Sequence, residues 1–109
     1  MDFDKKQKAR FGLGPEDMLR LRLYVVHGAP NSVRALANLN ALCREYLPGR
    51  HRLEVVDFLK EPLRALEDGV LFSPTLARLS PPPVRTLVGS LDAKAQVPRF
   101  LGLEGPYEG

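Results

Sequence analysis

The stretch that decides the fold runs from Leu19 to Ser32 and reads LRLRLYVVHGAPNS. Leucines at alternate positions are separated by Arg20, Arg22 and Tyr24, and this period of two predicts a strand with one buried face. The residues from Gly28 onward are typical of a turn, and Asn31 or Ser32 could cap a helix because a short side-chain oxygen accepts a first-turn amide proton. The stretch therefore predicts a strand, a turn and the start of a helix.

The remainder of the chain continues this alternation of strands and helices. The helix has an inner stripe at spacings of three and four and ends at Pro48-Gly49; the stripe is Leu36, Leu39, Cys43 and Leu47. A second strand is expected at Leu53 to Phe58, joined to the first by a right-handed crossover, and a short helix follows between Glu61-Pro62 and Asp68-Gly69. Two antiparallel strands, Thr75 to Leu79 and Val84 to Val88, flank three prolines, and Asp92 is expected to cap a last helix.

The predicted order βαβαββα gives an α/β fold with a mixed four-stranded sheet and about three helices, which is thioredoxin-like. In such folds the turn after the first strand carries the reactive cysteines, and an X-Pro bond, often cis, faces it; here that bond is Ser73-Pro74. The turn has no thiol, and the single cysteine, Cys43, falls within the helix. Disulfide exchange needs an attacking thiolate and a resolving partner, so we expect a binding scaffold and no enzyme.

Composition suits one small domain. The chain has 109 residues, of which 44% are apolar, and a formal net charge of +3; this length supports one core. We expect a flexible extension over 1–17, the domain over 18–104 and a tail over 105–109. The chain shows no membrane-length apolar run and no apolar block near its start, and with one cysteine a cytoplasmic location is expected. No His, Cys or carboxylate cluster has metal-ligand spacing, and we expect no cofactor.

The charge of +3 is too small to indicate nucleic acid and suits an acidic protein partner. Four arginines crowd around the first helix and second strand, where they form either a solvated face or a docking surface: Arg34, Arg44, Arg50 and Arg52.

Two strings of residues carry a resemblance to a known family. The chain reads Pro30-Asn31-Ser32-Val33-Arg34-Ala35-Leu36 after the first strand and Pro81-Pro82-Pro83-Val84-Arg85 before the fourth. With Leu23-Tyr24-Val25, Val55-Val56-Asp57, Leu59-Lys60, Pro62, Pro74-Thr75-Leu76-Ala77 and Gly89, these strings resemble the KaiB family of circadian clock proteins from Leu19 to about Leu91.

The resemblance implies a regulator without enzymatic activity that docks on the ring of a KaiC-type ATPase and modulates its phosphorylation or signalling. It implies further partners, a KaiA-like protein or a histidine kinase of the SasA type. Because the sensor domain of SasA is itself KaiB-like, the alternative function is that of a stand-alone sensor or adaptor domain of this kind. The partner-binding residues we expect are Tyr24, Asn31, Arg34, Arg52, Lys60 and Arg85.

Members of this family interconvert between a thioredoxin-like monomer and a tetramer with a rearranged C-terminal half. The residues we expect to determine the fold of this chain are Pro74, Gly89, Pro98, Phe100 and Gly102. Clock-type members have Gly-Leu-Asp where this chain has Phe100-Leu101-Gly102, so a stress pathway is an alternative to a clock. We expect Phe100 to pack the last helix onto the sheet in the thioredoxin-like state, with the stable part of that helix starting near Val97 so that Pro98 falls in its first turn.

Two other classes remain as alternatives. A glutathione-binding thioredoxin-like protein would use Ser32 to activate the thiol, but glutathione transferases add a helical domain that has no counterpart after Gly109. Nucleic-acid binding through the arginines lacks the aromatic platform that stacks bases, because Tyr24 is the only aromatic residue in the first two strands before Phe58.

Overall fold

A computed structural model describes residues 18–92 and 96–102. Four strands and three helices follow one another as β1 (Leu19–Val25), α2 (Pro30–Tyr46), β2 (His51–Asp57), α3 (Pro62–Glu67), β3 (Thr75–Ser80), β4 (Arg85–Val88) and α4 (Gln96–Phe100). The strands form one sheet in the order β2-β1-β3-β4, in which β1 and β2 are parallel and the other neighbours antiparallel. The predicted fold class is confirmed. The expected extension 1–17 and tail 105–109 lie outside the described residues.

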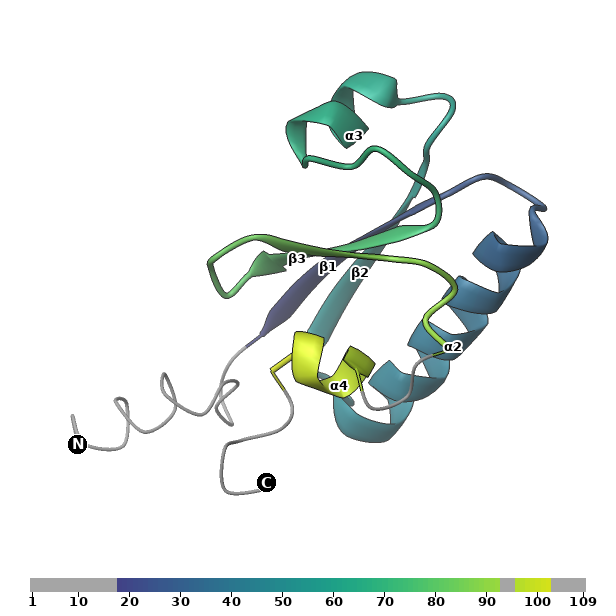
Figure 1. Cartoon of the computed structure of the whole chain (residues 1–109). Coiled ribbons are helices and arrows are strands. Elements are labelled where there is room, and N and C mark those ends of the chain that lie inside the picture. The colour runs from purple at the N-terminus through teal and green to yellow at the C-terminus, as the bar shows by residue number, and fades with distance from the viewer. Residues whose placement is uncertain (1–17, 93–95, 103–109) are drawn as a thin grey trace.

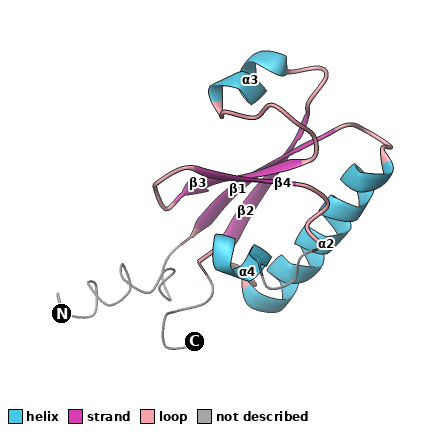
Figure 2. Ribbon diagram, viewed as in Figure 1, coloured by secondary structure: helices cyan, strands magenta, loops and turns pink. Residues whose placement is uncertain are grey.

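The sheet separates two layers of helices. Figures 1 and 2 show α2 and α4 together on one side of the sheet and α3 on the other. Side chains of β1 pack on both faces of the sheet, because successive side chains of a strand point to opposite faces. Leu19, Leu21 and Leu23 pack with α2 and α4 in the larger core cluster, while Tyr24 belongs to a smaller cluster under α3.

The larger cluster matches the predicted stripe of α2. Leu39, Cys43 and Leu47 are buried and Leu36 is partly buried against the same core. The smaller cluster joins Tyr24 and Val56 of the sheet to Ala65 of α3 and to Val70 after it. α3 is therefore held by few apolar contacts, which makes its polar contacts to the sheet important.

The predicted cap of α2 is wrong. The helix begins at Pro30, Ala29 is the N-cap, and no side chain caps it. A proline suits the first turn because its fixed φ is helical and its missing amide proton is not needed there. Asn31 is exposed, while the Ser32 hydroxyl is buried and accepts a hydrogen bond from the Val26 amide, with 3.0 Å between the two atoms. Ser32 thus ties the helix to the end of β1.

The C-terminal residues adopt the thioredoxin-like arrangement. Pro98 is the third residue of α4 as described, Gln96–Phe100; the expected start of the helix adjoins residues 93–95, which lie outside the described residues. Phe100 packs against the larger core as predicted but is only partly buried, whereas Leu101 has no exposed surface. The predicted cap at Asp92 precedes residues 93–95, which lie outside the described residues. No helix in the described ranges has the length and apolar character needed to cross a membrane.

Candidate partner-binding surfaces

The turn after β1 is where thioredoxin-like enzymes place their cysteines. Here it contains His27 and Gly28, and the Ser73-Pro74 bond before β3 is cis. Cys43 is 1% exposed on the inner face of α2, and burial raises its pKa to about 11. A thiol with this pKa is almost fully protonated near neutral pH, and the thiolate is the reactive form. Cys43 therefore acts as a small core residue.

An ion-pair network fastens α3 to the sheet. Arg22 Nη1 lies 2.7 Å from Asp68 Oδ2, and Arg22 Nε lies 2.9 Å from Glu54 Oε1. Arg64 Nη2 lies 2.7 Å from the other oxygen of Glu54. One end of α3 and two neighbouring strands are thereby joined through alternating charges. We call Arg22, Tyr24, Glu54, Arg64 and Asp68 the α3 network.

Tyr24 does not lie on the surface, contrary to the contact role that we expected for it. Its side chain has no exposed area, and its hydroxyl lies 2.6 Å from Asp68 Oδ2 and 2.9 Å from the Arg64 carbonyl oxygen. The single proton goes to the carboxylate, the stronger acceptor. Burial and the neighbouring Asp68 charge raise the pKa of Tyr24 to about 12. Tyr24 supports α3 from beneath.

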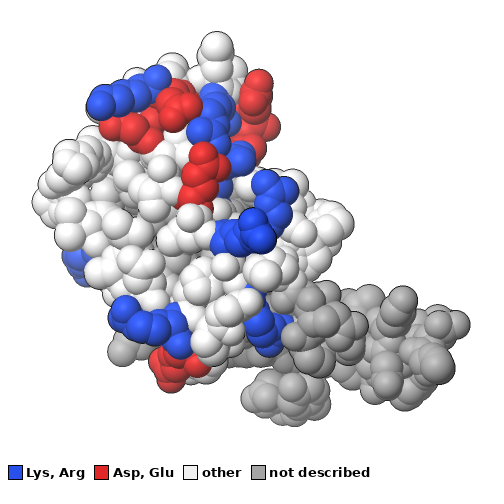
Figure 3. Space-filling view, turned by 180° about the vertical axis from the view of Figure 1, so that it is seen from behind, with Lys and Arg blue, Asp and Glu red and all other residues white. Residues whose placement is uncertain are grey.

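The charges of the network perturb one another. Burial alone would raise the pKa of Asp68, but hydrogen bonds from Tyr24 and Arg22 and the positive charge of Arg22 outweigh it, so this pKa is lowered. Hydrogen bonds from Arg64 and Arg22 lower the pKa of Glu54. Figure 3 shows blue and red side chains interleaved at the upper end of the molecule, where α3 lies. The two arginines and two carboxylates of the network are ionised at neutral pH and balance one another, while Tyr24 keeps its proton.

Large apolar side chains are exposed on α3 and the loops that flank it. Each is more than 60% exposed, and the set is Leu59, Leu63, Leu66, Leu71 and Phe72. Leu63 and Leu66 stand three residues apart on a helix and so share one face, while Ala65 faces the sheet. We call these five residues the α3 apolar surface. Exposed apolar side chains on and around one short helix make this region a candidate interaction site.

A second polar cluster holds the loop after β4 against α2. Arg34 Nη2 lies 2.6 Å from Asp92 Oδ2, and Asn38 Nδ2 donates to Asp92 Oδ1 at 2.8 Å and to the Ser90 carbonyl oxygen at 2.9 Å. The Ser90 hydroxyl also donates to Asp92, and these hydrogen bonds from Ser90 and Asn38 lower the pKa of Asp92. The loop needs this support because Leu91 has a φ of 65°, in the left-handed region that disfavours side chains.

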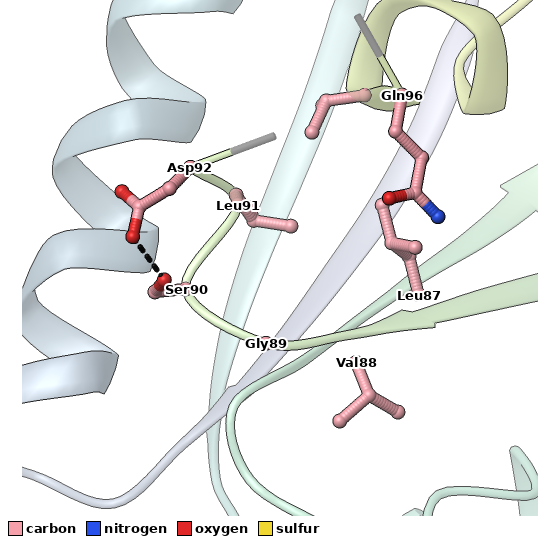
Figure 4. A pocket seen from close by; sticks show the side chains of 8 residues that line it. Leu87, Val88, Gly89, Ser90, Leu91, Asp92 and Gln96 are labelled. Carbon is pink, nitrogen blue, oxygen red and sulfur yellow. Dashed lines mark hydrogen bonds between the residues drawn. The ribbon is translucent and has the colours of Figure 1, made fainter. Parts of the chain in front are cut away.

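A pocket of about 190 Å³ lies beside this loop. Figure 4 shows Leu87, Leu91 and Gln96 around it, with the hydrogen bond between Ser90 and Asp92 at its rim. Asp92 is already hydrogen-bonded by three neighbours, Arg34, Asn38 and Ser90, so its carboxylate is not free to bind a ligand in this pocket. In the described parts of the chain, no three His, Cys, Asp or Glu residues are placed to hold a metal ion.

The structure does not bring the predicted contact residues onto one surface. Arg34 is paired on α2 and Arg52 lies at the start of β2, while Lys60 precedes α3 and Arg85 is on the edge strand β4. Asn31 is in the first turn of α2. All five are exposed, but they lie on different sides of the sheet. Sequence reasoning missed the α3 apolar surface, for which the close spacing of Leu63 and Leu66 around a small inward Ala65 was the available indication.

Two of the predicted fold-determining residues, Pro74 and Gly89, lie in contact, whereas Pro98, Phe100 and Gly102 lie in or just after α4. Pro74 is buried, and its carbonyl oxygen accepts a hydrogen bond from the Gly89 amide at 2.9 Å. This bond joins the residue before β3 to the residue after β4. Gly89 has a φ of 123° and Gly102 a φ of 81°, both favouring glycine. Whether these residues control a change of fold stays a prediction.

The geometry places the protein in the class of thioredoxin-like folds without thiol redox chemistry, because the turn after β1 has no cysteine and the one cysteine is buried. Comparison with solved structures agrees on the fold. The N-terminal domain of Synechococcus elongatus SasA is 20% identical, with a TM-score of 0.63 over 82% of this chain and 90% of that domain. A thioredoxin of Fasciola hepatica is 16% identical, with a TM-score of 0.62 over 92% of this chain and 88% of that one.

The chain belongs to the KaiB family, because the model of the KaiB domain matches residues 22–103. The circadian clock oscillator protein KaiB of a Cyanothece species is 46% identical over 88 residues, which are 81% of this chain and 82% of that protein. The KaiB protein of Thermostichus vulcanus is also 46% identical, over 81% of this chain and 80% of its own length. The predicted resemblance is confirmed, and the family is one of clock regulators.

Proposed function

We propose that this chain is a regulator without enzymatic activity that binds the ring of a KaiC-type ATPase and modulates its phosphorylation or signalling. The observation that carries the proposal is the 46% identity to circadian clock oscillator proteins over most of both chains. An ATPase partner uses cytoplasmic ATP, so a cytoplasmic location is part of the proposal. A binding role is also supported by the thiols of the chain. The turn after β1 contains no cysteine, and the single thiol, Cys43, is buried with a raised pKa.

The α3 apolar surface is the part of the molecule best suited to that contact. Burying a leucine side chain contributes roughly 1.5–3 kcal/mol, and interface energy concentrates in a few such residues surrounded by polar ones. Lys60 adjoins the surface in sequence, and Arg64 and Glu61 pair beside it at 3.2 Å. We therefore propose Leu63 and Leu66 as the central contacts, with Lys60 at the rim.

Binding to a purified KaiC-type ATPase from the same organism tests the proposal. Complex formation by the full chain is measured by size-exclusion chromatography with light scattering, and the affinity by fluorescence anisotropy. Leu63→Glu and Leu66→Glu are expected to weaken binding at least about tenfold. Val33→Glu is the matched control, because Val33 is 56% exposed on α2, away from α3.

Two results would overturn different parts of the proposal. If the unaltered chain binds no KaiC-type ring, with either ATP or ADP present, the proposed function is wrong. If it binds and all three variants bind equally well, the partner is right and the α3 apolar surface is not the contact. Circular dichroism of each variant establishes that the fold is retained.

A further inference from the structure

Two arginines stand side by side on the part of the sheet that α3 leaves uncovered. α3 packs over the far ends of β1 and β2, where Tyr24 and Val56 lie. At the opposite ends of the same strands, Arg20 and Arg52 are paired in register and both are exposed. Neighbouring strands are about 4.8 Å apart, so the two side chains leave the sheet next to each other on one face.

Neither arginine has a carboxylate partner among the described residues. Within residues 18–92 and 96–102, no hydrogen bond or ion pair involves the side chain of Arg20 or Arg52. Arg22, the next residue of β1 on this face, has two carboxylates within 2.9 Å. Like charges directly opposite each other on neighbouring strands are destabilising. Arg20 and Arg52 therefore repel each other, whereas Arg22, two residues further along β1, is neutralised by Glu54 and Asp68.

A bulge adjoins the pair. The register between β1 and β3 shifts between Arg20 and Leu21, so that Ser80 stands opposite Arg20 while Arg78 stands opposite Leu21. Bulges bend a strand, increase its twist and re-aim side chains, and they are frequent beside functional sites. Ser80 of β3 is the register partner of Arg20 on the side of β1 away from Arg52. Charge, exposure and a local departure from regular pairing therefore coincide at this end of the sheet.

We propose that Arg20 and Arg52 form a docking site for an acidic segment of a protein partner, whose carboxylates pair with the two guanidinium groups. The planar fork of arginine matches a carboxylate with two parallel hydrogen bonds. A nucleic acid fits less well, because its backbone needs a longer run of cations than these two arginines. The next positions on this face, Arg22 and Glu54, are already ion-paired with each other. This site is distinct from the α3 apolar surface and does not depend on the function proposed above.

The probe is a fluorescein-labelled peptide of alternating serine and glutamate, with a serine and glutamine peptide as its neutral counterpart. Anisotropy is measured with the full chain at about 50 mM salt, where screening is weak. The double variant Arg20→Gln, Arg52→Gln is expected to bind the acidic peptide about tenfold more weakly. Arg44→Gln, Arg85→Gln is the matched control: it removes the same charge from exposed residues on α2 and β4 and is expected to change binding less than about twofold.

A second measurement separates binding from stability. Removing the repulsion should raise the thermal midpoint of the Arg20→Gln, Arg52→Gln protein even as peptide binding is lost. Leu63→Glu should keep peptide binding, which separates this site from the proposed ring contact. Equal loss of binding in both double variants would show attraction by net charge alone and overturn the proposal. Tighter binding of a labelled oligothymidylate than of the acidic peptide would also overturn it, in favour of nucleic acid.

Discussion

The Tyr24 hydroxyl and the Asp68 carboxylate meet at 2.6 Å, although the two residues are 44 positions apart in the chain. The same carboxylate oxygen accepts a hydrogen bond from Arg22 at 2.7 Å. A strand and the end of a helix are thereby joined at one oxygen. Because α3 has a single buried residue, Ala65, this polar junction contributes a large share of what holds the helix on the sheet.

Tyr24→Phe should therefore destabilise the protein although it keeps the ring in the core. The change removes the hydroxyl proton from a mostly buried carboxylate, and hydrogen bonds to charged groups contribute about 1.5–3 kcal/mol. We expect the free energy of unfolding, measured in urea, to decrease by about 1.5–3 kcal/mol. Tyr46→Phe is the control, since Tyr46 is 50% exposed and should change stability by less than about 0.5 kcal/mol. Equal effects of the two substitutions would contradict the role of the junction.

The lowered pKa of Asp68 predicts a dependence of stability on pH. A carboxylate whose pKa is lower in the folded state stabilises the fold above its unfolded pKa, about 3.9 for aspartate, and this contribution is lost as pH falls through the folded value. Unfolding measured from pH 5 down to about pH 2 should lose stability less steeply for Asp68→Asn than for the unaltered chain. Some slope should remain, because the pKa values of Glu54 and Asp92 are lowered as well.

Local periodicity explains which parts of the fold were predictable. The alternation in β1 and the stripe of α2 are set by side chains two, three and four positions apart, and both agree with the structure. The start of α2 was misplaced because capping preferences at Asn31 and Ser32 were weighed above Pro30, which begins the helix without a side-chain cap.

The candidate surfaces were less predictable because they depend on contacts distant in the sequence. Alternation correctly puts Tyr24 on the face opposite the leucines, but no local pattern shows that α3 returns to cover that face. A helix of six residues is also too short for periodicity to distinguish its inner from its outer side, so the spacing of Leu63 and Leu66 around Ala65 was too weak an indication to predict their exposure. The pairing of Arg20 with Arg52 required the register of the parallel strands.

The thiol of Cys43 should be unreactive toward disulfides in the folded protein. Its raised pKa of about 11 leaves about one molecule in ten thousand as thiolate at pH 7, and its side chain is 1% exposed. Reaction with a chromogenic disulfide reagent should be very slow in buffer and fast in denaturing urea. Insulin disulfides should not be reduced by the purified chain. A fast native reaction, or insulin reduction that Cys43→Ala abolishes, would show that the thiol is accessible.

The anchoring of α4 provides a direct comparison between a predicted residue and an observed one. Leu101 has no exposed surface, while Phe100, the residue expected to dock the helix, is only partly buried. Truncating a fully buried leucine costs about 2–5 kcal/mol because contacts are lost and a cavity is left. Leu101→Ala should therefore lower the free energy of unfolding by that amount, and Phe100→Ala should cost less despite removing a larger side chain. Urea unfolding followed by far-ultraviolet circular dichroism measures both, and a greater loss for Phe100→Ala would restore it as the principal anchor of the helix.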